Sequence, residues 1–449
     1  MTQAGQHHQP NAQTAPSSVA LAGEPYLTHD VPGTGGHIKA RESDFLVEEI
    51  PLYEPSGEGE HLYLMIEKTG LATNQLIDVL AAHFGVKPNR IGYAGMKDKR
   101  AITRQVVSVH VPGRSAQDFP MVRDDALHVL WAEMHVNKLR RGHLKGNRFA
   151  VYIRGIEPTR VLDAERALRI LVRRGMPNLF GPQRFGARLN NHILGRCYLL
   201  RQHKALLDEL LGPRDATADR NADARQAYAE GRYADALALT PTGQRTECEA
   251  LRALARGRRP SECVNAVNDM QRRFWIAAFQ SAVFNRVCMQ RLTDGTFDQF
   301  MEGDIAARRG VSGLFRVDAN ALADPTTEQR RVALEISPTG PLWGAKMMEA
   351  DGAPGALERT ELEREGVSIE PLQWAAKTFG ESLAGSRRPL RAPVIDPRLE
   401  GGVDEHGGYI RCAFELPPGS YATMVMREVM KVFPLEWQPD LDDPADAGG

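Results

Sequence analysis

The segment GYAGMKDKRAITRQ, residues 92–105, contains the side chain best suited to chemistry, Asp98. Lys97 and Lys99 flank Asp98, and cationic neighbours favour the ionised form of a carboxylate by Coulomb attraction. Two glycines in the segment permit a tight bend that lifts this Lys-Asp-Lys group out of the preceding strand. An ionised aspartate on a rigid turn can act as a nucleophile or a base. A solvated, charged loop is the alternative interpretation of the same residues.

Two other segments suggest contacts with nucleic acid. Residues 137–149, NKLRRGHLKGNRF, contain five Lys or Arg and no acidic residue. Cations of this kind bind phosphates because nucleic acid then releases its counterions. Residues 175–186, GMPNLFGPQRFG, place Asn178 and Phe180 on a loop, where an amide can bond a base edge and a ring can stack on an unstacked base. The alternatives are an exposed charged loop and a phenylalanine that anchors its loop to the core.

Several common chemical motifs are absent from the sequence. There is no P-loop, no GxGxxG after a strand, no HExxH and no GxSxG elbow, which argues against most nucleotide-, metal- and serine-dependent enzymes. The five cysteines are widely spaced without a CxxC pair, so we expect no disulfide framework or zinc site, and a reducing cytoplasm. Residues 1–36 contain no Lys or Arg, and no apolar run is long enough to span a bilayer, so we expect no signal peptide and no membrane contact.

The length and charge of the chain set broad limits on its organisation. A chain of 449 residues exceeds what one core usually organises, which predicts two domains. The 56 Lys and Arg nearly balance the 57 Asp and Glu. RNA-binding proteins are often basic, so this balance is mild evidence against one. It still permits a local basic cleft, because binding depends on the charge near the phosphates.

Hydrophobic spacing predicts the elements that position these segments. Thr73 and Gly85 resemble the caps of one helix, and the irregular mixture of strands and helices predicts an α+β fold with a mixed sheet. Composition changes near residue 204, where a region rich in Ala, Arg, Glu and Leu begins. The expected strands are 45–50, 62–66, 91–94, 102–111, 149–154 and 409–416. The expected helices are 74–84, 161–174, 268–292 and 424–432.

Ordered blocks of sequence then give a resemblance. AGMKDKRAITRQ is similar to the AGxKDKxAxTxQ motif of the TruD family of tRNA pseudouridine synthases. The other blocks resemble the family in the family's order and extend over residues 37–432. They are KARESDFLVEE, GEGEHLYL, NKLRRGHLKGNRF, PNLFGPQRFG, Phe279-Gln280-Ser281 with Phe284-Asn285, PTGPLWG and LPPGSYAT.

The resemblance implies a fold and an activity. It implies a pseudouridine synthase catalytic domain with a mixed sheet, formed by residues 37–203 and 401–437 and interrupted by an inserted α/β TRUD-type domain at 204–400. We expect residues 1–36 to be a disordered extension and 438–449 to be an acidic tail. The implied enzyme is a cytoplasmic monomer that isomerises a uridine of tRNA, position thirteen in the D-arm, to pseudouridine. The reaction breaks and forms equivalent bonds, so no cofactor, nucleotide or metal is expected.

The resemblance also implies roles for single residues. Asp98 is the essential carboxylate, Phe180 stacks on the target base, and Asn178 orients Asp98 or the substrate. Lys39 and Phe45 match the basic and aromatic positions of KANxxDF-like segments, although KARESDF departs at the third position. We expect Lys39, or Lys97 as a second candidate, to keep Asp98 ionised. The expected substrate-binding residues are Phe45, Phe180, Arg140, Arg141, Lys145, Arg148 and Arg184.

Two alternative functions remain at this point. One is a non-catalytic RNA-binding protein or RNA chaperone of the same fold. The other is a carboxylate-dependent hydrolase of glycosidic bonds, for which the sequence offers no second acid or base beside Asp98.

Overall fold

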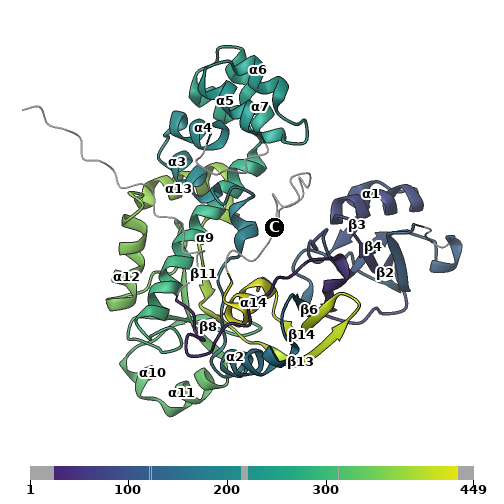
Figure 1. The fold of residues 1–449 in the computed structure, drawn as a ribbon, viewed down its shortest axis with the longest axis vertical. Coiled ribbons are helices and arrows are strands. Elements are labelled where there is room, and N and C mark those ends of the chain that lie inside the picture. Colours follow the sequence, from purple (N-terminus) through teal and green to yellow (C-terminus); the bar gives the residue numbers. More distant parts are fainter. Residues whose placement is uncertain (1–24, 121, 123, 214–220, 312, 433–449) are drawn as a thin grey trace, which may run out of the picture.

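The computed structural model describes residues 25–432, apart from residues 121, 123, 214–220 and 312. The predicted acidic tail at 438–449 and the first 24 residues of the predicted extension lie outside this range. A strand-rich region and a helix-rich region lie side by side in Figure 1, joined by segments that run between them. In the part of the chain so described, none of the helices combines the length and the apolar character needed to cross a bilayer.

A mixed eight-stranded sheet forms the strand-rich region, as predicted. Its order is β13-β14-β6-β1-β4-β2-β5, with β3 paired to β4. β1 and β4 are parallel, and the other pairs are antiparallel. The strands are β1 (Phe45–Pro51), β2 (His61–Thr69), β3 (Ile91–Tyr93), β4 (Ile102–His110), β5 (Leu127–His135), β6 (Leu144–Arg154), β13 (Ile395–Asp404) and β14 (Gly407–Leu416).

One face of the sheet packs on the largest apolar core. Side chains alternate between the two faces of a strand, so Phe45, Val47 and Phe149 share this face. Helices α2 (Val161–Arg174) and α14 (Ala422–Met430) contribute to the same core. The interior is therefore built from segments near both ends of the chain.

The opposite face of the sheet carries a row of ion pairs across five strands. Arg104 lies 2.7 Å from Glu67 and 3.1 Å from Glu48. Arg148 lies 2.9 Å from Glu48 and 2.7 Å from Glu415. Positive and negative side chains alternate along this row, and each contacts its neighbours. We call the five residues, Glu67, Arg104, Glu48, Arg148 and Glu415, the charge ladder.

Helix α1 (Thr73–Phe84) packs against β2 and β3 with the apolar spacing expected from the sequence. Gly85 ends it at φ 65°, a left-handed conformation that glycine adopts without a Cβ penalty. Thr73 is not the N-cap that we predicted, because Ala72 holds that position. The Thr73 hydroxyl instead accepts a hydrogen bond from the backbone N–H of Lys97, beside Asp98.

Helices dominate the second region. Helix α9 (Asp269–Thr293) joins the two regions, since one face contributes Phe284 and Cys288 to the sheet core and the other contributes Trp275 and Phe279 to a helical core. The other helices are α3 (Asn191–Leu199), α4 (His203–Leu211), α5 (Ala222–Ala229), α6 (Tyr233–Leu239), α7 (Arg245–Ala255), α8 (Pro260–Ala266), α10 (Ala319–Ala323), α11 (Pro325–Val332), α12 (Gly352–Glu363) and α13 (Ile369–Phe379).

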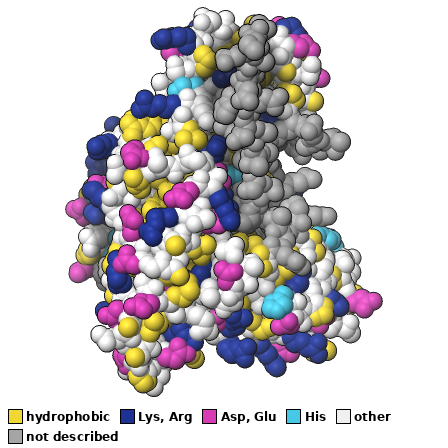
Figure 2. All heavy atoms as spheres, turned by 90° about the vertical axis from the view of Figure 1, so that its left-hand side faces the viewer, with side chains coloured by type: hydrophobic (Ala, Val, Ile, Leu, Met, Phe, Trp, Pro, Cys, Tyr) yellow, Lys and Arg dark blue, Asp and Glu magenta, His cyan; other side chains and the backbone are white. Residues whose placement is uncertain are grey.

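Short strands complete the helical region. A four-stranded sheet has the order β11-β10-β8-β9, and β12 pairs with β7, which follows α2 in the chain. These strands are β7 (Met176–Pro177), β8 (Ile305–Arg308), β9 (Leu314–Arg316), β10 (Ile336–Leu342), β11 (Ser386–Pro389) and β12 (Arg391–Ala392). On the outer face of this region, Figure 2 shows acidic and basic side chains interspersed rather than separated by sign.

The packing refines the domain boundaries that we expected. The boundary at residue 400 would cut β13, which pairs with β14 in the large sheet. The boundary at residue 204 would separate α3 from the helical core to which its buried residues belong. We therefore propose that the insertion runs from about residue 190 to about residue 394.

Residues 25–36, expected to be disordered, instead pack against α14. The buried Thr28 donates from its backbone N–H and its hydroxyl to the Glu428 carboxylate, at 3.0 and 2.9 Å. The Arg427 guanidinium lies 4.4 Å from the centre of the Tyr26 ring. Small polar residues dominate the average composition of the extension, and that average concealed the few apolar side chains that anchor this segment.

Candidate active site

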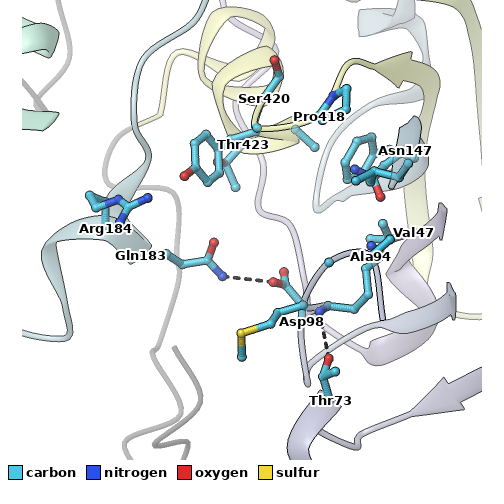
Figure 3. A pocket seen from close by; sticks show the side chains of 18 of the residues that line it. Val47, Thr73, Ala94, Asp98, Asn147, Gln183, Arg184, Pro418, Ser420 and Thr423 are labelled. Atoms are coloured by element: carbon cyan, nitrogen blue, oxygen red, sulfur yellow. Dashed lines mark hydrogen bonds between the residues drawn. The ribbon is translucent and has the colours of Figure 1, made fainter. Parts of the chain in front are cut away.

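A cavity of about 430 Å³ lies between the large sheet and the helical region. Phe45, Asn147 and Asp98 line it from the sheet side, and Gln183 and Arg184 line it from the facing side. Figure 3 shows Asp98 and Asn147 with Gln183 and Arg184 across the cavity from them. The 418–423 loop, whose last two residues begin α14, forms a third wall. A cavity of this size falls within the ordinary range for small-ligand sites, about 300–1,000 Å³.

The turn between β3 and β4 presents Asp98 to this cavity. Thr73 of α1 holds the N–H of Lys97 at 3.0 Å, and the Lys68 ammonium donates to the backbone carbonyl of Asp98 at 3.0 Å. Lys68 also donates to the carbonyl of Leu71. Two elements on either side therefore fix the turn by its backbone, which leaves the Asp98 carboxylate available.

The Asp98 carboxylate is held from both sides of the cavity. The Lys39 ammonium lies 2.6 Å from Oδ2, and the Gln183 amide donates to Oδ1 at 3.1 Å. Burial by itself raises the pKa of Asp98, but the charge of Lys39, the hydrogen bonds from Lys39 and Gln183, and the charge of Lys68 together outweigh it. The pKa of Asp98 consequently lies below its ordinary value, and the side chain is an anion at neutral pH.

Lys39 occupies an unusual backbone conformation. Its φ is 60°, in the left-handed region that residues other than glycine seldom adopt. Its ammonium lies 4.4 Å from the centre of the Phe45 ring, and its side chain is only 8% exposed. Residues in strained conformations cluster at functional sites, where the surrounding structure supports the cost. The Lys39 and Phe45 predicted from the sequence thus lie together at Asp98.

Lys97 also lines the cavity, but its ammonium does not pair with Asp98. Its ammonium pairs with Glu49 at 2.7 Å, and the two side chains are 4% and 1% exposed. Glu49 also accepts from the backbone N–H of Val106 in β4. Lys97 therefore anchors the turn to the sheet, and Lys68 is the second ammonium beside Asp98.

Asn178 is buried behind the third wall and makes no hydrogen bond to Asp98. Its side-chain oxygen accepts from Arg388 at 2.7 Å and from Ser420 at 3.3 Å, and its amide donates to the carbonyl of Pro389. Arg388 of β11 also donates to the carbonyl of Gly419 at 2.7 Å. Asn178 and Arg388 thus tie the inserted region to the 418–423 loop.

Phe180 is buried beside the cavity rather than on its lining. The guanidinium of Arg388 lies 4.2 Å from the centre of its ring, and the Phe284 ring packs edge-on at 5.7 Å. Asn285 of α9 bonds both the N–H and the carbonyl of Phe180, at 2.9 and 3.0 Å. Tyr421, which does line the cavity, lies 6.2 Å from Phe180, centre to centre.

The cationic residues that we predicted to bind substrate lie in different environments. Arg184 lines the cavity 5.2 Å from the Phe180 ring, with no acidic partner among the described residues. Arg140 and Lys145 are exposed on either side of Gly142, which is itself part of the cavity lining. Arg141 donates to the Tyr93 hydroxyl. Arg148 belongs to the charge ladder and lies on the strand face opposite Asn147.

Four functional candidates were missed from the sequence: Gln183, Lys68, Arg388 and Tyr421. Gln183 and Tyr421 stand inside the blocks PNLFGPQRFG and LPPGSYAT, so their position in the resemblance was the available signal. Lys68 and Arg388 come near the site only through the pairing of distant segments. No local pattern identifies residues of that kind.

Comparison with known proteins places the chain in a family. The family model described as tRNA pseudouridine synthase D (TruD) matches residues 21–429. The chain is 43% identical to "tRNA pseudouridine synthase D" of Geobacter sp. (strain M21) over 410 residues, which cover 90% of this chain and 99% of the relative. It is 35% identical to a protein of that name from Thermus thermophilus over 427 residues, covering 95% and 97% of the two chains.

A solved structure agrees with these sequence matches. The crystal structure of a putative tRNA pseudouridine synthase D (TruD) from Methanosarcina mazei superimposes with a TM-score of 0.78 at 27% identity. The superposition covers 94% of this chain and 99% of that chain. This chain therefore belongs to the TruD family of tRNA pseudouridine synthases, which are isomerases.

Proposed function

We propose that this enzyme converts a uridine of tRNA, position thirteen in the D-arm, to pseudouridine, with Asp98 as the catalytic carboxylate. The observation that carries the proposal is the ionised Asp98, held by Lys39 and Gln183 on the surface of a cavity large enough for a nucleotide. The family and the names of the relatives support tRNA as the substrate.

The proposed reaction breaks the C1′–N1 bond of uridine, turns the detached uracil and forms a bond from C1′ to C5. Asp98 begins the reaction as an anion, either by adding to the nucleoside or by removing the C2′ proton. The detached uracil is an anion, and the cationic groups around the site stabilise it. After the new bond forms, C5 loses its proton and N1 gains one. Asp98 is released from the nucleoside, or returns the C2′ proton, so atoms and electrons balance without a redox partner.

The target base must leave the RNA stack before it can enter the cavity. An aromatic ring in the site offsets part of this cost, since stacking contributes about 1–3 kcal/mol per base. We expected Phe180 to supply that ring, but Arg388 covers it in this structure. We propose that Tyr421, on the cavity surface, stacks on the base and that Phe180 supports Tyr421 from behind.

We propose that the RNA backbone crosses the mouth of the cavity near Arg184, Arg140, Arg141 and Lys145. Arg184 supports this proposal best, because it lines the cavity and has no acidic partner in the described part of the chain. Arginine is suited to phosphate because its planar guanidinium can donate two parallel hydrogen bonds.

The experiment that tests the function is Asp98→Asn. This variant keeps the size of the side chain, so we expect it to fold and to bind tRNA. It should form no pseudouridine when total tRNA is mapped by chemical labelling. Wild-type protein added to RNA from cells that lack the gene should restore the missing modification. Turnover by Asp98→Asn would reject Asp98 as the catalytic carboxylate.

A wild-type protein that binds tRNA but forms no pseudouridine would support the non-catalytic alternative. Release of free uracil without pseudouridine would instead support a glycosidic hydrolase. Measurement of pseudouridine and free base in the same reaction separates the three functions.

A further inference from the structure

Gln183 forms a hydrogen bond to Asp98 from the opposite wall of the cavity. It belongs to the short 3-10 turn η5 (Pro182–Phe185), on the wall facing the sheet, and it lines the cavity together with its neighbour Arg184. Its amide nitrogen donates to Oδ1 of Asp98 at 3.1 Å. A base that is to react with Asp98 must enter the cavity beside this amide.

The contact with Asp98 fixes which way the amide points. A side-chain amide can generally turn over and exchange its donor and its acceptor, so it accepts either kind of partner. An ionised carboxylate only accepts hydrogen bonds. Gln183 must therefore turn its nitrogen to Asp98 and its oxygen away. Figure 3 shows that oxygen directed away from Asp98, toward the side of the cavity where Thr423 lies.

The Gln183 oxygen is an acceptor of fixed polarity inside the cavity. Among the described residues, it has no hydrogen-bond partner. Other polar side chains of the lining lack this property: the hydroxyls of Ser420, Tyr421 and Thr423 can donate or accept, and the Asn147 oxygen is buried away from the cavity surface.

We infer that Gln183 selects uridine over cytidine at the reaction site, by accepting a hydrogen bond from N3–H of the base through its side-chain oxygen. Uracil carries a hydrogen on N3, whereas N3 of cytosine is an acceptor. With cytosine in the site, its N3 and the Gln183 oxygen, which are both acceptors, would therefore face each other. The inference rests on the proposed function, and it makes Gln183 a specificity-determining residue rather than only a support for Asp98.

The test measures binding of two RNAs that do not react. One tRNA carries pseudouridine at the target position, which preserves the order carbonyl, N3–H, carbonyl on the base edge, and the other carries cytidine there. Wild-type enzyme should bind the pseudouridine RNA about tenfold more tightly than the cytidine RNA. This ratio is expected when one hydrogen bond is exchanged for an unpaired acceptor. Gln183→Met keeps the length of the side chain without the amide, and its preference should fall to within about twofold.

A second variant tests the orientation of the amide without touching Gln183. In Asp98→Asn the residue at 98 can donate as well as accept, so the Gln183 amide can turn over and accommodate cytosine. Its preference should also fall. Arg184→Met is the matched control on the same turn, because loss of a phosphate contact should weaken both RNAs equally and leave their ratio unchanged.

The outcomes separate the inference from the proposed function. If Gln183→Met or Asp98→Asn keeps the full preference, or if Arg184→Met loses it equally, the inference is overturned, whereas pseudouridine formation by the wild type still supports the function. A wild type that forms no pseudouridine in tRNA contradicts the proposed function, whatever the binding ratios. A merely structural Gln183 would change activity without changing the ratio.

Discussion

The Lys39 ammonium lies 2.6 Å from the Asp98 carboxylate although the two residues are 59 positions apart in the chain. Lys39 reaches this position from a left-handed backbone conformation, beside the ring of Phe45. Asp98 is partly buried, which alone would favour its neutral form, and the charge of Lys39 is the largest single influence that opposes this. The reactivity proposed for Asp98 thus depends on a residue from a separate segment.

Lys39→Met should move the acidic limb of the pH–rate profile. In the wild type the pKa of Asp98 lies below its ordinary value, so kcat/KM should fall only at pH values well below neutrality. Without Lys39 the pKa rises, and the fall should begin at higher pH. Lys39→Arg keeps the charge and serves as the control. An acidic limb that stays in place in Lys39→Met would contradict this role.

Tyr421→Ala and Phe180→Ala should fail in different ways. Removal of a stacking ring should lower the kcat/KM of Tyr421→Ala by about 5- to 150-fold, with little change in stability. Removal of a buried ring should cost Phe180→Ala about 3–5 kcal/mol of unfolding free energy. Denaturant unfolding and pseudouridine assays measure the two effects, and Tyr421→Phe should stay close to wild type. A stable but inactive Phe180→Ala would restore Phe180 as the stacking ring.

Arg184→Met should reduce the salt dependence of tRNA binding. Each phosphate contact contributes roughly one unit to the slope of log K against log salt, so the slope should fall by about one. Arg148→Met is the matched control, because Arg148 pairs with Glu48 and Glu415 on the other face of its strand. Filter binding at several salt concentrations gives both slopes. An equal fall in Arg148→Met would mean that RNA also contacts the charge ladder.

Arg387→Met should destabilise the inserted region. The Arg387 and Glu358 side chains are 0% and 3% exposed and bond at 2.6 and 2.7 Å. Burial raises the pKa of Glu358, and removal of its partner would leave a buried carboxyl uncompensated. Breaking such a pair costs about 3–5 kcal/mol.

The exposed pair Lys346–Glu381 provides the control for that measurement, since its side chains are 67% and 79% exposed. Lys346→Met should leave the urea midpoint almost unchanged, because exposed pairs contribute little. Equal shifts of the midpoint in the two variants would contradict the assigned importance of the buried pair.

Local patterns in the sequence predicted the helices in which buried apolar residues recur at regular spacing. The helix at 161–174 has the predicted bounds, α1 begins one residue earlier than predicted, and α9 differs from its prediction by one residue at each end. The glycine-rich turn at Asp98 was recognised because its residues are contiguous.

Contacts between residues that are far apart in the chain could not be predicted from local patterns. The sequence does not indicate which acidic residue pairs with Lys97, and only the fold brings Glu49 of β1 to it. Gln183 and Asp98 meet across the cavity from segments 85 positions apart. The identity of a buried partner is a property of the folded arrangement, whereas hydrophobic spacing records only the face that each element buries.

The docking of residues 25–36 onto α14 has a consequence for synthesis of the protein. Thr28 and Glu428 are 400 positions apart, and α14 begins with the last two residues of the 418–423 loop that closes the cavity. On the ribosome residues 25–36 must wait, without their partner, until α14 has emerged. A product that terminates before β14 would lack β14, α14 and one wall of the cavity, so synthesis through residue 430 is a condition for any working copy.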